Sequence, residues 1–344
     1  MRDFKMSFLV AIVSVAALQA QTPAPGRAGQ APAAPIDRAS IVWPPGYVEP
    51  NTPGMPYLTP DTPTGTGPLK AIMASDPGAP EFVTYHPADL NALGDRKMPI
   101  LVWGNGSCSY IGNRFRYFLT EIASHGYLAL GGGPMGPKER ETITMASNNP
   151  TRAVGAPPPG TAPAAPAQPA NPAQRRVTVE LLSQGIGWAM AENSRPGSKF
   201  FGRLDTNAVA VMGQSCGAGL AGTFGSDPRV KTVGMWMGSN PNMTDKHRVP
   251  VLLITGDETY DIAYGRGKAN FEAIDNVPIF HAWREKLPHL GTFRQQNGGE
   301  QGRIAVAWLQ WQLRGDETAA RMFTGDDCTL CRDSNWHVQK KQID

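Results

Sequence analysis

The sequence predicts an α/β protein in which helices cover both faces of a doubly wound, mostly parallel sheet. Short apolar runs alternate with longer helix-like segments along the chain, which is typical of βα units. Several of these runs are continuously apolar, such as "VPVLLIT" at 249–255, as expected for strands that are buried on both faces. A hydrophobic fraction of 41% in 344 residues is enough for a large core. We therefore expect a three-layer α/β/α sandwich.

The individual elements follow from the same pattern. Apolar runs bounded by turn-forming residues predict strands at 82–85, 99–103, 127–130, 208–212, 230–236, 249–255 and 278–282. Longer segments with helical periodicity predict helices at 111–123, 177–192, 216–225 and 303–314.

The first twenty residues have the composition of a secretory signal peptide. Arg2 and Lys5 precede an apolar run at 7–18, and small residues end at Ala20. The run is shorter than the roughly 18 residues that a membrane helix requires. Leu18 is not the small residue best suited to cleavage, so a retained N-terminal anchor is the alternative. We expect a secreted or periplasmic protein with no membrane attachment once residues 1–20 are removed.

Two segments are too poor in large apolar residues to fold. Residues 21–40 are rich in Ala and Pro and predict a disordered linker. A second Pro/Ala-rich stretch at about 150–175 lies between structured segments and predicts an insertion loop. The remaining chain, 41–344, is expected to form a single domain.

The charge pattern argues against nucleic acid as a partner. The formal net charge is +3, and the basic residues are scattered rather than clustered.

The predicted strand at 208–212 leads into Gly213-Gln214-Ser215-Cys216-Gly217, a G-x-S-x-G motif followed by a helix of small residues. This context is typical of a nucleophile elbow, in which a tight turn lifts the serine hydroxyl above the sheet. Residues two before and two after the serine must then lack side chains, because they approach neighbouring backbone closely. Ser215 is the predicted nucleophile.

With this motif the chain resembles the α/β-hydrolase superfamily, and within it secreted esterases similar to dienelactone-hydrolase-like and cutinase-like polyester hydrolases. The resemblance spans about 80–340 and includes "PILVWGNGSCS", "VAVMGQSCGAG", "VPVLLITGDETYDIAY" and "PHLGT". Dienelactone hydrolases have cysteine at the centre of the elbow, whereas here the centre is Ser215 and Cys216 follows it. This difference favours serine over thiol chemistry.

The resemblance implies an acid and a base that follow the serine in the order Ser, Asp or Glu, His. The loop after 249–255 holds Asp257, Glu258 and Asp261. The similar enzymes favour Asp261, in "DIAY", with Asp257 and then Glu258 as alternatives. His289, in "PHLGT", is the predicted general base.

The superfamily also implies an oxyanion hole made of two backbone N–H groups. One is expected from Cys216. The other is expected from the loop after 99–103, where Ser107 is preferred and Gly106 is the alternative.

The four cysteines of an exported chain predict two disulfides. Cys328 and Cys331 form a CxxC pair, which predicts a local structural disulfide, with a redox or zinc pair as the alternative. If both oxyanion loops meet, Cys108 and Cys216 are neighbours and can form a disulfide, the alternative being two buried free thiols.

These features predict a serine carboxylic-ester hydrolase that works through an acyl-enzyme, with a small-molecule or polymeric ester as substrate. An acyltransferase with the same three residues, or a catalytically silent hydrolase-like binding protein, is the alternative. Dinucleotide, phosphate-loop and zinc-helix motifs are missing from the sequence, so neither a cofactor nor a metal is expected. Oligomeric state and the kind of ester are left open.

Overall fold

The computed structural model describes residues 48, 55, 57–136 and 175–344. The predicted signal peptide, the predicted linker and nearly all of the predicted insertion lie outside these residues.

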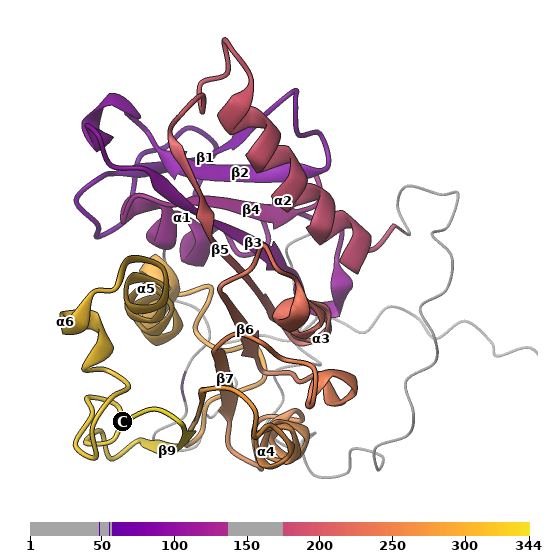
Figure 1. Cartoon of the computed structure of the whole chain (residues 1–344), viewed down its shortest axis with the longest axis vertical. Coiled ribbons are helices and arrows are strands. Elements are labelled where there is room, and N and C mark those ends of the chain that lie inside the picture. The colour runs from indigo at the N-terminus through magenta and orange to yellow at the C-terminus, as the bar shows by residue number, and fades with distance from the viewer. Residues whose placement is uncertain (1–47, 49–54, 56, 137–174) are drawn as a thin grey trace, which may run out of the picture. The chain divides into compact units, whose positions relative to one another are not determined.

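The described strands form one nine-stranded sheet, coloured by position along the chain in Figure 1. The strands are β1 (Ala71–Ser75), β2 (Phe82–Pro87), β3 (Met98–Gly104), β4 (Leu128–Gly132), β5 (Leu204–Gln214), β6 (Thr232–Trp236), β7 (Val251–Gly256), β8 (Ile279–Arg284) and β9 (Trp336–Lys341).

The order across the sheet is β1-β2-β4-β3-β5-β6-β7-β8-β9. Neighbours from β4 to β8 run parallel, and the pairs β1/β2, β2/β4 and β8/β9 run antiparallel. The prediction of an α/β protein with a mostly parallel sheet is confirmed. Because the central strands are parallel, their carboxyl ends lie along one edge of the sheet.

Helices pack on both faces of this sheet. They are α1 (Arg116–Ser124), α2 (Val179–Ser194), α3 (Cys216–Gly222), α4 (Tyr264–Ala273), α5 (Gly299–Arg314) and α6 (Glu317–Ala320). Short 3-10 helices are η2 (Asn91–Leu93), η3 (Gly106–Cys108), η8 (Thr223–Ser226), η9 (Pro241–Met243) and η10 (Gln296–Gly298). Apolar residues of α1 and α5 belong to one core cluster, and those of α2, α3 and α4 belong to the other (Figure 1).

The strands supply both clusters because successive side chains of a strand point to opposite faces. In β3, Leu101 and Trp103 pack with α1 and α5, whereas Ile100 and Val102 pack with α2 and α3. All four side chains are completely buried. This two-sided burial is the physical reason for the continuous apolar runs in the sequence.

The apolar pattern did not predict four of the described strands and helices, which are β1, β9, α4 and the four-residue α6. The edge strands β1 and β9 pair with a neighbouring strand on one side only. β1 is short and reads "AIMAS", and β9 reads "WHVQKK", which has no continuous apolar run. Helix α4 contains Gly265 and Gly267, which lower helix propensity, and it buries few side chains. Helix α1 also begins later than predicted, at Arg116 instead of residue 111.

An aromatic cluster lies next to the strand ends that carry the candidate site. Trp103, Phe118, Trp236 and Phe293 are in mutual edge or tilted contact, with ring centroids between 4.8 and 5.8 Å apart. Phe293 comes from the segment just after His289, so the cluster anchors that segment to β3, α1 and β6. Among the described residues, no helix is long and apolar enough to cross a membrane.

Candidate active site

Ser215 occupies the turn between β5 and α3, at the carboxyl edge of the sheet. Its backbone has φ 56° and ψ −117°, a conformation that L-residues rarely adopt. The Ser215 N–H donates to the carbonyl of Trp236 at 2.8 Å, which ties the turn to the neighbouring strand. The turn leaves the serine partly exposed, although β5 before it is buried.

The glycines of the motif are required by close backbone packing. A Cβ atom on Gly213 or Gly217 would collide with backbone atoms of Gly217 and Gly104, respectively. Strand β3, strand β5 and helix α3 therefore approach one another at three glycines. This is the physical basis of the G-x-S-x-G spacing that the sequence presents.

Three of the predicted site residues form a continuous hydrogen-bonded chain. His289 Nε2 lies 2.9 Å from Ser215 Oγ, and His289 Nδ1 lies 2.6 Å from Asp261 Oδ1. An ionised carboxylate only accepts, so Nδ1 carries the proton and Nε2 is free to accept from the serine hydroxyl. The structure thus brings together a hydroxyl, an imidazole and a carboxylate in the order in which a carboxylate can orient a base toward a nucleophile.

The Asp261 side chain is fixed by burial and by two backbone donors. Its side chain is fully buried. Oδ2 accepts the N–H of Gly256 at 2.8 Å, and Oδ1 accepts the N–H of Ala263 at 2.9 Å. These donors compensate the burial of the carboxylate and fix its direction toward His289.

The two alternative acids lie elsewhere. Asp257 accepts the backbone N–H groups of Thr259 and Tyr260 through Oδ1, and that of Lys286 through Oδ2 at 2.7 Å. It therefore stabilises the loop instead of facing His289. Glu258 is exposed.

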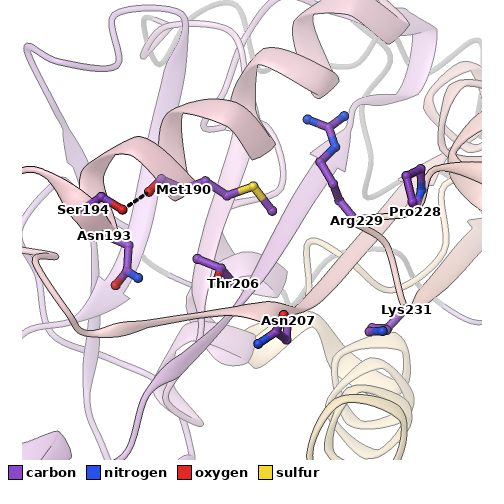
Figure 2. Close-up of a pocket in the computed structure, with 8 residues that line it drawn as sticks. All are labelled: Met190, Asn193, Ser194, Thr206, Asn207, Pro228, Arg229 and Lys231. Atoms are coloured by element: carbon purple, nitrogen blue, oxygen red, sulfur yellow. Dashed lines mark hydrogen bonds between the residues drawn. The ribbon is translucent and has the colours of Figure 1, made fainter.

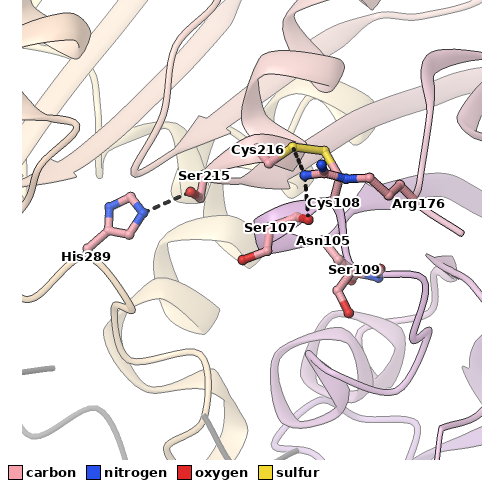
Figure 3. Close-up of a disulfide and its surroundings, with 8 residues drawn as sticks. All are labelled: Asn105, Ser107, Cys108, Ser109, Arg176, Ser215, Cys216 and His289. Atoms are coloured by element: carbon pink, nitrogen blue, oxygen red, sulfur yellow. Dashed lines mark hydrogen bonds between the residues drawn. A yellow bond between two sulfur atoms is a disulfide. The ribbon is translucent and has the colours of Figure 1, made fainter. Parts of the chain in front are cut away.

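The predicted oxyanion donors lie at a disulfide, since Ser107 precedes Cys108 and Cys216 is the cysteine to which Cys108 is bonded. Ser107 lies in η3 with φ 57° and ψ 14°, in the left-handed region. Cys216 is the first residue of α3, where a helix leaves its N–H groups unpaired. Neither backbone N–H group, of Ser107 or of Cys216, donates to a turn, loop or cap carbonyl in the described part of the chain. Figure 3 shows His289 on one side of Ser215 and this disulfide on the other.

Both predicted disulfides are present. Cys108 and Cys216 are bonded, with Cα atoms 5.2 Å apart and a sequence separation of 108. Cys328 and Cys331 are bonded with a separation of 3. The alternatives of free thiols and of a zinc pair are therefore excluded for these cysteines. Disulfides of this kind persist in oxidising compartments.

The sequence analysis did not identify the side chains that support the loop after β3, which holds the predicted oxyanion donor Ser107. Asn105 is completely buried, and its Nδ2 donates to the carbonyl groups of Ser109, Ile111 and Gly132. It holds the loop after β3 to the end of β4. Arg176 donates from Nη2 to the Ser107 carbonyl at 3.1 Å, on the outer side of the loop (Figure 3). Asn105 lies between two glycines directly after a buried strand, and this pattern could have indicated a structural role for its side chain.

A pocket lies at the other end of β5, away from Ser215. It has a volume of about 400 Å³ and includes Thr206 and Asn207 near the start of β5, Asn193 from α2, and Arg229 (Figure 2). Arg229 is occupied by Asp227 and Ser183. The hydroxyl of Ser194, which also lines this pocket, donates to the carbonyl of Met190 (Figure 2).

Comparison with models of known protein families finds no match, and comparison with curated proteins finds no similar sequence. Among the described residues, no group of three His, Cys, Asp or Glu side chains is placed to hold a metal ion.

Proposed function

We propose that this chain is a secreted serine hydrolase of the α/β-hydrolase fold that cleaves carboxylic esters through an acyl-enzyme. The observation that carries the proposal is the hydrogen-bonded chain Ser215–His289–Asp261, with distances of 2.9 and 2.6 Å. Such a chain converts a weakly nucleophilic hydroxyl into an effective nucleophile.

The position of these residues in the fold supports the same proposal. Ser215 follows the central strand β5 on a strained turn, Asp261 follows β7, and His289 follows β8. This order and this placement at the carboxyl edge are those of the α/β-hydrolase superfamily.

In the proposed mechanism, Ser215 Oγ attacks the ester carbonyl carbon while His289 Nε2 takes the hydroxyl proton. The Ser107 and Cys216 N–H groups stabilise the oxyanion of the tetrahedral intermediate. The intermediate collapses, the C–O bond to the alcohol breaks, and His289 returns the proton to the leaving alkoxide. Water then attacks the acyl-enzyme by the same route and releases the acid.

The two disulfides support export to an oxidising compartment, because cytosolic thiols are kept reduced. We therefore propose that the protein acts in the periplasm or outside the cell, after removal of the predicted signal peptide. The proposed substrate is a small or polymeric ester.

The test combines covalent labelling with turnover. The purified protein is treated with a fluorophosphonate probe and assayed with p-nitrophenyl esters of graded acyl length, with and without a competing alcohol acceptor. We expect labelling at Ser215, release of free acid in both conditions, and loss of label and turnover in Ser215→Ala.

A Ser215→Ala variant that is folded and retains turnover would refute the proposal. Transfer of the acyl group to the alcohol in place of hydrolysis would identify an acyltransferase. A folded wild-type protein that neither labels nor turns over any ester would point to a binding protein.

A further inference from the structure

We infer that Gln214 is a positioning residue that holds His289 in place for proton transfer. The inference rests on the proposed function and adds a residue to which the motif assigns no role, since Gln214 is a variable position of G-x-S-x-G. The proposed role of Gln214 is to hold the backbone of His289. The hydrogen bonds of the imidazole ring orient the side chain but do not hold this backbone.

The peptide groups of His289 are held from both sides. The His289 N–H donates to the carbonyl of Tyr260 at 3.1 Å, and the His289 carbonyl accepts Nε2–H of Gln214 at 2.8 Å. Tyr260 is the residue before Asp261, and Gln214 is the residue before Ser215. The base is thus attached by its backbone to the residues that precede its acid and its nucleophile.

The Gln214 side chain is itself fixed. It is only 3% exposed and stands at the end of β5, whose backbone pairs with β3 and β6. Its Oε1 lies so close to Gly106 that a Cβ atom there would collide with it. The amide therefore fills the space between the oxyanion loop and His289, and one packed side chain contacts both.

His289 needs this support because no regular element contains it. It lies in a turn between β8 and α5, and its side chain is 18% exposed. Proton transfer requires that His289 Nε2 stays within hydrogen-bond distance of Ser215 while Nδ1 stays within hydrogen-bond distance of Asp261. A misplacement of about 1 Å at a catalytic group can lower the rate by about 10²-fold.

Two substitutions remove the donor and keep the size of the side chain. Gln214→Met has no polar atom, and Gln214→Glu has the same shape but, when ionised, only accepts. We expect kcat for a p-nitrophenyl ester to fall by about 10- to 100-fold in both, with KM changed by less than about twofold. The rate of fluorophosphonate labelling should fall in parallel, since it uses the same base.

Asn193→Leu is the matched control. Asn193 Oδ1 accepts the N–H of Leu204 at 2.8 Å, at the opposite end of β5, so this variant also loses one side-chain to backbone hydrogen bond. We expect a lower melting temperature and an unchanged kcat.

The outcomes separate the inference from the function it rests on. If wild type hydrolyses esters and a folded Gln214 variant keeps kcat within about twofold of it, Gln214 is only structural and the inference is wrong. If KM rises while kcat is kept, Gln214 acts on substrate binding and the inference is also wrong. A wild-type protein without labelling or turnover overturns both. If Gln214→Met does not fold, the kcat of the isosteric variant Gln214→Glu tests the inference.

Discussion

The Nδ1 atom of His289 lies 2.6 Å from Oδ1 of Asp261, although the two residues come from different loops 28 positions apart. Asp261 is buried and held by two backbone N–H groups, so the fold itself fixes the carboxylate toward His289. Asp257, four residues earlier, has the same chemistry and points its oxygens at other donors. Substitutions of the two aspartates should therefore have different effects on turnover and on stability.

Asp261→Asn should lower kcat by about 10⁴-fold, the loss seen when the aspartate of a serine-protease triad becomes an amide. The amide can donate to Nδ1 and so favours the tautomer in which Nε2 carries the proton and no longer accepts from Ser215. Steady-state hydrolysis of a p-nitrophenyl ester measures this loss.

Asp257→Asn is the control for that experiment. It should reduce stability, because Lys286 and two loop N–H groups lose a charged acceptor, while kcat changes by less than about tenfold. If Asp257→Asn has the larger effect on kcat in a folded protein, the assignment of the acid to Asp261 is wrong.

The Cys108–Cys216 disulfide should support both stability and turnover. It closes a loop with a sequence separation of 108 and joins the segments that carry the two proposed oxyanion donors. The double variant Cys108→Ser/Cys216→Ser should lose about 2 to 5 kcal/mol of unfolding free energy. We also expect kcat to fall, because the two N–H groups are no longer held at a fixed separation. Urea denaturation and ester turnover measure the two effects.

The variant Cys328→Ser/Cys331→Ser gives the comparison. This disulfide spans a separation of 3 and lies outside the site, so kcat should be unchanged. Equal kcat losses in the two double variants would show that the effect of the first disulfide is not local to the oxyanion loops.

Two glycines of α3 should respond oppositely to alanine. A Cβ on Gly217 would collide with the backbone of Gly104, whereas a Cβ on Gly219 would find its nearest neighbour, Ser239 O, at 3.5 Å. Gly217→Ala should therefore destabilise the fold and abolish turnover, because β3 and the elbow must separate. Gly219→Ala should be tolerated, with up to about 1 kcal/mol gained from helix propensity. Thermal melts of both variants test this, and a stable, active Gly217→Ala would contradict it.

Buried histidines should make the fold sensitive to mild acid. Burial lowers the pKa of His86, His247 and His281 from 6.5 to about 4 in the folded protein. Between pH 6.5 and 4 the unfolded chain binds protons that the folded chain does not. The free energy of unfolding should therefore be unaffected above pH 6.5 and should fall below it, by about 1.4 kcal/mol per pH unit for each histidine.

His247→Leu isolates one of these contributions. The His247 side chain is completely buried, and neither ring nitrogen has a hydrogen-bond partner among the residues that the structure describes. Leucine has a similar volume and does not titrate, so this variant should lose less stability than wild type between pH 7 and pH 5. Urea denaturation at the two pH values measures this, and an unchanged pH dependence would show that His247 is not protonated on unfolding.

Features that depend only on residues close together along the chain were predictable from the sequence. Continuous apolar runs predicted the buried parallel strands, because burial on both faces leaves no position for a polar side chain. The strand, the glycine spacing and the small-residue helix around Ser215 are a local unit, so the turn at Ser215 was predictable as well. The polar edge strand β9 was not, because pairing with β8 rather than its own pattern makes it a strand.

By itself the sequence determined the α/β class and the turn that presents Ser215. It also limited the candidate acids to three residues of one loop and suggested which cysteines could pair. Only the tertiary structure decided that Asp261 and not Asp257 faces His289, that Cys108 bonds to Cys216, and that Gln214 reaches the His289 carbonyl. Each of these contacts joins residues between 28 and 108 positions apart. Such residues meet only because parallel strands carry their following loops to one edge of the sheet, and the packing of those loops then selects one side chain among chemically equal candidates.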